Sequence, residues 1–500
     1  MNIQEAKEEI KKTVWAYTSR TETGTFHIPV KRQRPVLLIG PPGIGKTAIM
    51  EQIARECSLG LVSYTMTHHT RQSAIGLPVL RQREFQGKEY TVTAYTMSEI
   101  IASVYEQIEQ KGCREGILFL DEINCVSETL MPAMLQFLQY KTFGSHHLPD
   151  GWVIVAAGNP ASYNRSVREF DTVTLDRVKY MEVDPDLEVW KKYALVRGLH
   201  PAVLSFLELR PECFYVMEAG QRGFVTGRGW EDLSEMLLTL ESLKLEVDDI
   251  LFGQYLQEKE TARAFAFYYR LYEKWNGQIH PERILQGKYS KESENPEKLP
   301  KLPFDERLCI VWLLLQRIYG MAERFQEQEK LAKSLQYFTD GLKQKGPIKG
   351  EDLEKACMDG LERRKKGMLV QKDWGLLAPE EEEREKKLAE AIQSCMEQAR
   401  HTEGLQAFQS RVDIEEEKKE EQQKDLKAGL ENGIEFVRKT FGEGQELVIL
   451  LTGILEHPHT GKAMREELKE EYLKVTAFLN ADSKEEELRR RISGKDSWNG

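Results

Sequence analysis

A glycine-rich segment at residues 40–47 has the spacing of a phosphate-binding loop. It reads Gly-Pro-Pro-Gly-Ile-Gly-Lys-Thr and directly follows the apolar run 36–39, so it matches G-x-x-x-x-G-K-[ST] after a predicted strand. Lys46 would bring positive charge to the β- and γ-phosphates, the Thr47 hydroxyl would ligate Mg²⁺, and the helix that follows would add the positive end of its dipole. The segment predicts a site for ATP and Mg²⁺ made of Gly40, Pro41, Pro42, Gly43, Ile44, Gly45, Lys46, Thr47 and Ala48.

Two adjacent carboxylates end a second apolar run. Residues 116–120 read as a strand and are followed by Asp121 and Glu122. At the carboxyl edge of a strand, Asp121 can hold the metal through its water shell, and Glu122 can polarise the attacking water as a general base. An isolated strand often ends in acidic turn residues, but beside a P-loop the pair predicts hydrolysis of ATP to ADP and phosphate.

The fold that would bring these groups together is predicted by the hydrophobic pattern of residues 1–183. Short apolar runs alternate there with longer amphipathic stretches, which predicts a buried, mostly parallel sheet flanked by helices. The apolar runs are 36–39, 61–64, 117–120 and 153–157, and the amphipathic stretches are 47–57 and 97–110.

The rest of the chain reads as helical. Residues 184–245 are expected to form a small helical domain, with helices at 187–196, 201–209 and 230–243. Residues 246–345 form a helical extension with a linker at 288–303, and residues 346–500 a charged helical region. The charge runs 380–387 and 415–424 are typical of solvated helix faces or linkers.

The composition of the chain limits the kinds of partner and the cellular location that we expect. The net charge of −11 over 500 residues argues against a surface made mainly for nucleic acid or acidic membrane. The seven cysteines include no CxxC pair, and the charged start of the chain is unlike a signal peptide. The longest apolar stretch near the C-terminus, 447–455, is too short to cross a bilayer. We therefore expect a cytoplasmic protein without membrane insertion.

The chain resembles the MoxR group of AAA+ ATPases over roughly residues 30–245. The resemblance rests on Asp-Glu-Ile-Asn at 121–124, Met-Leu-Gln-Phe-Leu at 134–138 and Val-Ile-Val-Ala-Ala-Gly-Asn-Pro at 153–160. It implies an α/β P-loop AAA+ core followed by a helical lid, and the helical pattern beyond residue 246 predicts an all-α C-terminal extension.

The resemblance also implies roles for single residues. Asn159 would be the polar sensor that positions the lytic water, and Arg177, in Leu-Asp-Arg at 175–177, would be the arginine finger, with Arg165 and Arg168 as nearby competitors.

Residues 224–230 resemble the start of the lid helix that carries a second sensor, which would be Arg228. Gly227 stands where the family often has proline, which leaves Arg228 in register. For each of these arginines, an ordinary surface position is the alternative.

A finger reaches the γ-phosphate of a neighbouring subunit, so the resemblance implies a homo-oligomeric ring, expected to be a hexamer. Two interruptions of the core, 71–95 and 141–149, fall where this family has insertions that face the pore or the top of the ring. Their aromatic residues, Phe85, Tyr90 and Phe143, would either grip a substrate or simply pack the hairpins.

The function predicted is that of a MoxR-type motor that uses ATP to remodel or assemble a protein partner, in the manner of a chaperone. The resemblance implies a partner in trans with a von Willebrand factor A domain, since the chain has no Asp-x-Ser-x-Ser segment. The alternatives are an AAA+ motor acting on nucleic acid and a nucleotide-gated scaffold with little turnover; a metal-insertion motor would be a variant of the main prediction.

Overall fold

The computed structural model describes residues 1–68, 71–162, 167, 170–217, 223–288, 298–345, 350–373, 379–399 and 405–479. The chain divides into two compact units. The first contains residues 1–191, 212–236 and 246–262, and the second contains residues 192–211, 237–245 and 263–500. The domain boundaries expected after residues 183, 245 and 345 stay predictions.

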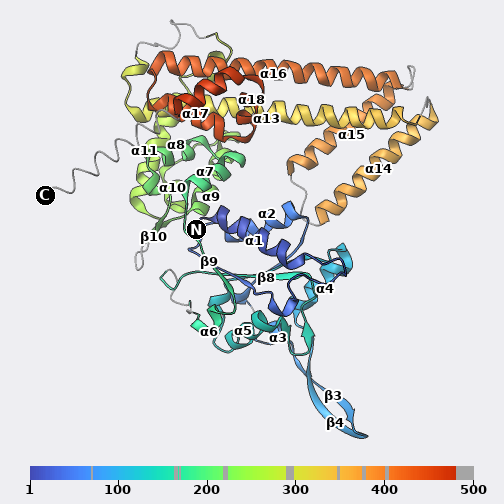
Figure 1. Ribbon diagram of the computed structural model, residues 1–500. Coiled ribbons are helices and arrows are strands. Elements are labelled where there is room, and N and C mark those ends of the chain that lie inside the picture. The colour runs from blue at the N-terminus through green and yellow to red at the C-terminus, as the bar shows by residue number, and fades with distance from the viewer. Residues whose placement is uncertain are drawn as a thin grey trace, which may run out of the picture. The chain divides into compact units, whose positions relative to one another are not determined.

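A five-stranded sheet forms the centre of the first unit (Figure 1). Its strands are, in spatial order, β2 (Gly60–Thr65), β5 (Gly116–Asp121), β8 (Trp152–Gly158), β1 (Val36–Ile39) and β9 (Lys179–Glu182). Every neighbouring pair is parallel, so the carboxyl ends of all five strands lie at one edge. The predicted α/β core with a parallel sheet is confirmed.

Both faces of this sheet are buried, which explains why its central strands are apolar without interruption. In β1, Leu37 faces one core cluster and Leu38 faces the other. Helices α4 (Glu99–Lys111) and α5 (Met131–Tyr140) pack on the first face. Helices α1 (Ile3–Thr18) and α2 (Lys46–Cys57) pack on the second.

Helix α1 and strand β9 have no counterpart in the sequence predictions. Helix α1 starts in a capping box, in which Asn2 and Glu5 each accept the other's backbone N–H. Strand β9 reads Lys-Tyr-Met-Glu and pairs only with β1, at the edge of the sheet. An edge strand with one buried residue has too little apolar pattern to be recognised.

The two interruptions of the core are hairpins. Strands β3 (Pro78–Phe85) and β4 (Lys88–Tyr95) form the longer one, and β6 (Thr142–Phe143) with β7 (His146–His147) the shorter one. The turn end of the shorter hairpin meets the base of the longer one, where the His146 Nε2 atom lies 3.1 Å from the Tyr95 carbonyl oxygen.

The aromatic residues of these hairpins differ in exposure. Phe143 is 2% exposed and stacks on Phe137 with the ring centroids 4.0 Å apart, so it belongs to the core rather than to a surface that grips a substrate. Phe85 and Tyr90 are each 50% exposed, and either could contact another molecule.

The first unit also contains several short elements. They are α3 (Arg71–Ile75), α6 (Thr172–Leu175), the strand pair β10 (Val216–Met217) and β11 (Phe224–Val225), and α10 (Asp249–Tyr255). Three helices run from one unit into the other: α7 (Leu187–Val196), α9 (Gly227–Ser242) and α11 (Lys259–Asn276).

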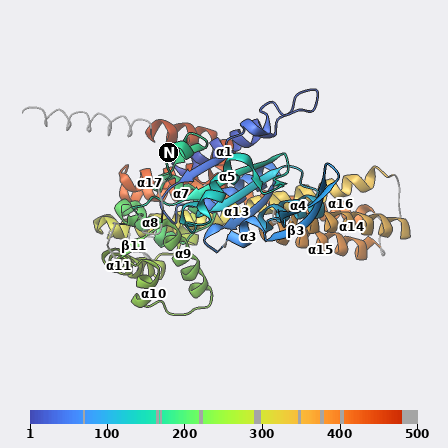
Figure 2. The same ribbon diagram turned by 90° about the horizontal axis from the view of Figure 1, so that it is seen from below.

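The second unit is helical in the part that the structure describes, as predicted. Its long helices α13 (Phe304–Lys343) and α16 (Leu405–Phe441) lie side by side, and α15 (Pro379–Ala399) lies along α16 (Figures 1 and 2). Its other helices are α8 (Pro201–Leu209), α12 (Pro281–Leu285), α14 (Glu351–Asp373), α17 (Gln445–Glu456) and α18 (Pro458–Glu467). The apolar residues Leu335, Cys357, Ile392 and Phe408 form one core shared by α13, α14, α15 and α16.

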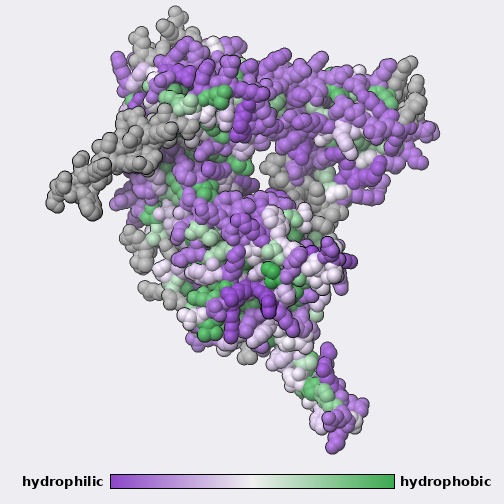
Figure 3. Space-filling view, in the orientation of Figure 1, coloured by the Kyte–Doolittle hydropathy of each residue, from purple (hydrophilic) through white to green (hydrophobic). Residues whose placement is uncertain are grey.

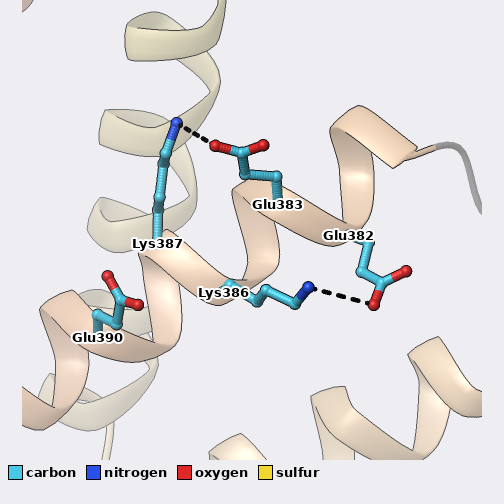
Figure 4. A pocket seen from close by; sticks show the side chains of 5 residues that line it. All are labelled: Glu382, Glu383, Lys386, Lys387 and Glu390. Carbon is cyan, nitrogen blue, oxygen red and sulfur yellow. Dashed lines mark ion pairs between the residues drawn. The ribbon is translucent and has the colours of Figure 1, made fainter.

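The charge run on α15 forms ion pairs along one helix. Glu382 and Lys386 are 3.3 Å apart, and Glu383 and Lys387 are 3.0 Å apart, both at i,i+4 spacing (Figure 4). Such pairs support an exposed helix by a few tenths of a kcal/mol each. Among the helices of the described residues, none has the length and apolarity to cross a membrane.

The burial of Phe143 gives a test of the fold. Phe143→Ala removes a fully packed ring, so we expect the free energy of unfolding to fall by about 3–5 kcal/mol. Phe85→Ala, at an exposed position of the other hairpin, should change it by less than about 0.5 kcal/mol. Thermal unfolding of both variants measures this, and equal losses for the two would contradict the assignment of Phe143 to the core.

Candidate nucleotide site

The glycine-rich segment forms a loop between β1 and α2. Gly43 and Gly45 have φ angles of +75° and +92°, a region that other residues rarely adopt, and Gly45 is the N-cap of α2. A Cβ atom on Gly43 would also lie 2.7 Å from the Thr226 Cβ atom. These glycines are needed both for the shape of the loop and for the close approach of Thr226.

Lys46 links the loop to the end of β8. Its Nζ donates to the Gly40 carbonyl at 2.7 Å, to the Pro41 carbonyl at 2.8 Å and to Asn159 Oδ1 at 2.9 Å. The residue is only 8% exposed, and this burial lowers the pKa of the ammonium group to about 8, opposed by Asp121 and aided by Arg228. The charge is thus held out of water, next to the space where phosphates would lie.

The predicted metal ligands are brought together. The Thr47 hydroxyl donates to Asp121 Oδ2 at 3.0 Å, although the two residues lie on different elements. Hydroxyl and carboxylate oxygens are ligands that Mg²⁺ prefers, and this pair fits an ion held by one direct and one water-mediated contact. The residues present therefore fit the predicted cofactor.

Glu122 lies beside this pair. It has a φ of +55°, its N–H donates to Asp121 Oδ1 at 2.9 Å, and its Oε2 accepts from the Thr67 hydroxyl at 3.0 Å. A non-glycine residue in the left-handed region is uncommon and is often found where a side chain is aimed at a functional site. Its assignment as a general base stays a prediction.

Asn124 holds the chain after β8 in place. It is 3% exposed, and its Nδ2 donates to the Asn159 carbonyl at 2.7 Å. A Cβ atom on Gly158 would lie 2.4 Å from Asn124 Oδ1, so that position requires glycine. Asn124 thereby fixes Asn159, whose side chain accepts from Lys46. The sequence pointed to Asn124 only as part of the resemblance and gave it no role.

Several residues near the start of α9 also approach the loop. Arg228 is exposed, and its charge contributes to the low pKa of Lys46. The Tyr215 hydroxyl donates to the Pro42 carbonyl at 3.0 Å. A Cβ atom on Gly227 would lie 3.1 Å from the Trp190 indole nitrogen and 3.3 Å from the Gly43 carbonyl, so a larger residue there would crowd both. Arg228 and the segment 224–230, which contains Thr226, were predicted from the resemblance, whereas Tyr215 and Trp190 carry no motif and were not predicted.

Arg177 lies elsewhere. It precedes β9, and Lys179 is level with Val36 at the beginning of β1, whereas the phosphate loop follows the end of β1. The length of a four-residue strand, about 13 Å, therefore separates the two ends. The Arg177 Nη1 donates to Gln139 Oε1 at 2.7 Å on an exposed surface. The competing candidates Arg165 and Arg168 lie outside the described residues.

A comparison with protein families agrees with this arrangement. The model of the ATPase family associated with various cellular activities (AAA) matches residues 36–175, the segment that runs from β1 to α6. The match supports an AAA+ superfamily member, a class of P-loop nucleotide-hydrolysing ATPases. No curated protein matches this chain.

The pKa of Lys46 leads to a pH prediction for nucleotide affinity. Lys46 is protonated at pH 7 but loses its proton near pH 8, well below the usual value of about 10.4. Bound phosphate favours the charged form, so above pH 8 binding takes up a proton, and affinity should fall by up to about tenfold per pH unit.

Fluorescence anisotropy with a labelled ATP analogue measures the affinity as the pH rises from 7 to above 9. Lys46→Arg is the control, because a guanidinium group does not titrate in this range. The variant should bind the ATP analogue more weakly, with an affinity that does not change with pH. If the affinity of the unmodified protein stays constant up to pH 9, Lys46 is not the charged group that binds the phosphates.

Proposed function

We propose that the first unit binds ATP with Mg²⁺ and hydrolyses it. The observation that carries this proposal is the hydrogen bond from Lys46 to Asn159, which joins the phosphate loop to the end of β8. Asp121 ends the neighbouring strand, β5, and Glu122 follows it, so both carboxylates lie at the same edge of the sheet. Phosphate-binding, metal-binding and water-activating groups thus converge on one small region.

Each group has a role in this proposal. The N–H groups of the loop and the first turn of α2 bind the phosphates, and the ammonium group of Lys46 exchanges its carbonyl acceptors for phosphate oxygens. Thr47 and Asp121 hold Mg²⁺, which neutralises charge on the phosphates when it is bound. Glu122 polarises the attacking water, and Asn159 positions that water.

Arg177 is proposed to act on the site of a second copy of this chain. It lies at the amino edge of the sheet, away from its own phosphate loop, and its side chain is exposed. An arginine supplied to a neighbouring site stabilises charge on the transferred phosphoryl group and is worth about 10³–10⁵ in rate. A ring of copies, six in the expected form, would complete every site in this way.

The motor is proposed to be of the MoxR type and to act in the cytoplasm. It would remodel or assemble a protein partner, and the candidate partner is a protein with a von Willebrand factor A domain. All seven cysteines are free thiols, which fits a reducing compartment. The described helices within residues 246–345 and 346–500 would offer a surface for such a partner.

The ATPase rate per subunit, measured against protein concentration, tests this proposal. Specific activity should rise with concentration, because sites form only between copies. Glu122→Gln and Arg177→Ala should each lose about 10²–10⁴ in rate while Glu122→Gln still binds ATP. Arg55→Ala, at an exposed arginine of α2, is the matched control and should keep normal activity. A protein that binds ATP without turnover at any concentration would favour the scaffold instead.

A further inference from the structure

The long β3–β4 hairpin separates its charges between two faces. Successive side chains of a strand point to opposite faces, so Arg81 and Arg83 share one face. The register places Tyr90 opposite Arg83 and Lys88 opposite Phe85. Phe85, Lys88 and Tyr90 therefore lie on the same face as the two arginines. The other face carries Leu80 and Gln82 on β3, followed by the directly opposed pair Glu84 and Glu89. One face is therefore basic and aromatic in a chain whose net charge is −11.

The basic face is available to another molecule. Every residue from 81 to 90 is exposed. Within the part of the chain that the structure describes, no salt bridge involves Arg81, Arg83 or Lys88. Unpaired cations that share a face with half-exposed aromatic rings are typical of binding surfaces for anionic partners.

The backbone of this hairpin is available as well. β3 pairs only with β4 in a two-stranded sheet, so no strand of the described residues covers its outer edge. Hydrophilic residues cover most of the outer half of the hairpin, with a small apolar area among them (Figure 3). Leu80, on β3 itself, is 76% exposed. An unpaired edge of eight residues is a template for one more strand.

We propose that the outer edge of β3 binds an extended, acidic segment of a protein partner as a third strand. Acidic residues of that segment would lie opposite Arg81 and Arg83, where cross-strand Cβ atoms are about 5 Å apart. An apolar residue would lie opposite Leu80, on the other face. Along β3 from Leu80 to Arg83, the residues opposite would be apolar, acidic, unspecified and acidic. The segment could run parallel or antiparallel to β3. The inference rests on the proposed function in one respect, namely that the motor acts on polypeptides.

The spacing of the cations favours a polypeptide over a single-stranded nucleic acid. Alternate residues of two adjacent strands keep the same separation of about 7 Å, so carboxylates at i and i+2 match Arg81 and Arg83 without adjustment. A peptide also supplies backbone N–H and C=O groups for the open edge, whereas a nucleic acid leaves that edge unpaired. Three cations would give nucleic acid only a weak electrostatic contribution.

Binding of short fluorescent peptides, followed by anisotropy, tests the proposal. The probe repeats Val-Glu-Thr-Glu, which places every glutamate on one face of an extended strand. One control peptide has the same composition with its glutamates in a single block, a second carries N-methyl groups on alternate residues to prevent strand addition, and a third probe is oligo-dT. The full-length protein is used, with and without ATP.

We expect the alternating peptide to bind more tightly than the three controls. Arg81→Gln combined with Arg83→Gln should weaken it by about 2- to 30-fold, as two cross-strand ion pairs would. Gln82→Glu, a charge change at the intervening position on the opposite face, should weaken it by less than about twofold. Basal ATPase activity should be unchanged in both variants, so a failure of the proposed motor shows in the ATPase rate and not in peptide binding.

Three results would overturn the proposal. Tighter binding of oligo-dT than of the peptide would make the basic face a nucleic-acid surface. Equal affinity for the alternating, blocked and N-methylated peptides would reduce the effect to non-specific charge attraction. No binding of any probe would leave the cations as a means of keeping the open edges of two hairpins apart.

Discussion

The parallel direction of the five strands is the constraint on which the candidate site depends. Ile39 is level with Gly158, and Thr65 is level with Asp121, so the chain leaves β1, β5 and β8 at one edge of the sheet. Residues that are up to 119 positions apart in the sequence, such as Gly40 and Asn159, therefore lie within reach of one ammonium group. The same constraint puts Arg177, which precedes a strand, at the opposite edge. A site that needs this arginine is complete only when another copy supplies it.

The buried charge of Lys46 connects the parts of the site. Its three acceptors replace the water that burial removes, which satisfies all three donors of the ammonium group. In the proposed site, phosphate oxygens would take over that role and release the Asn159 side chain, while Asn124 would still hold the Asn159 backbone. The role of Asn159 as a sensor of loop occupancy stays a prediction. Thr226, next to the start of α9, and Tyr215 also contact the loop.

The sequence predicted the parts of the molecule whose pattern is local. The strand at 36–39 and the helices at 187–196 and 201–209 were predicted with the bounds that the structure has, because apolar periodicity marks buried elements. β9 was missed, since a polar edge strand lacks that pattern.

In the candidate site, too, the residues with a local pattern were the ones predicted. The loop and Asp121–Glu122 were predicted from spacing alone, and Asn159 and Arg228 from resemblance. Tyr215 and Thr226 reach the loop through tertiary packing, which the spacing of a short motif does not encode. Phe143 could not be assigned either, because its partner Phe137 lies on another element.

The most direct test of the account mixes two inactive variants. Glu122→Gln keeps Arg177, and Arg177→Ala keeps Glu122, so a site between one copy of each contains both groups. In an equal mixture, half of the copies have Glu122 and half of their neighbours have Arg177, which predicts activity at about one quarter of the wild-type sites. A mixture of Glu122→Gln with Lys46→Ala, whose lesions lie on the same side of the site, should stay inactive. Restored activity in the first mixture alone is the predicted result; if neither mixture regains activity, Arg177 does not act on a neighbouring copy.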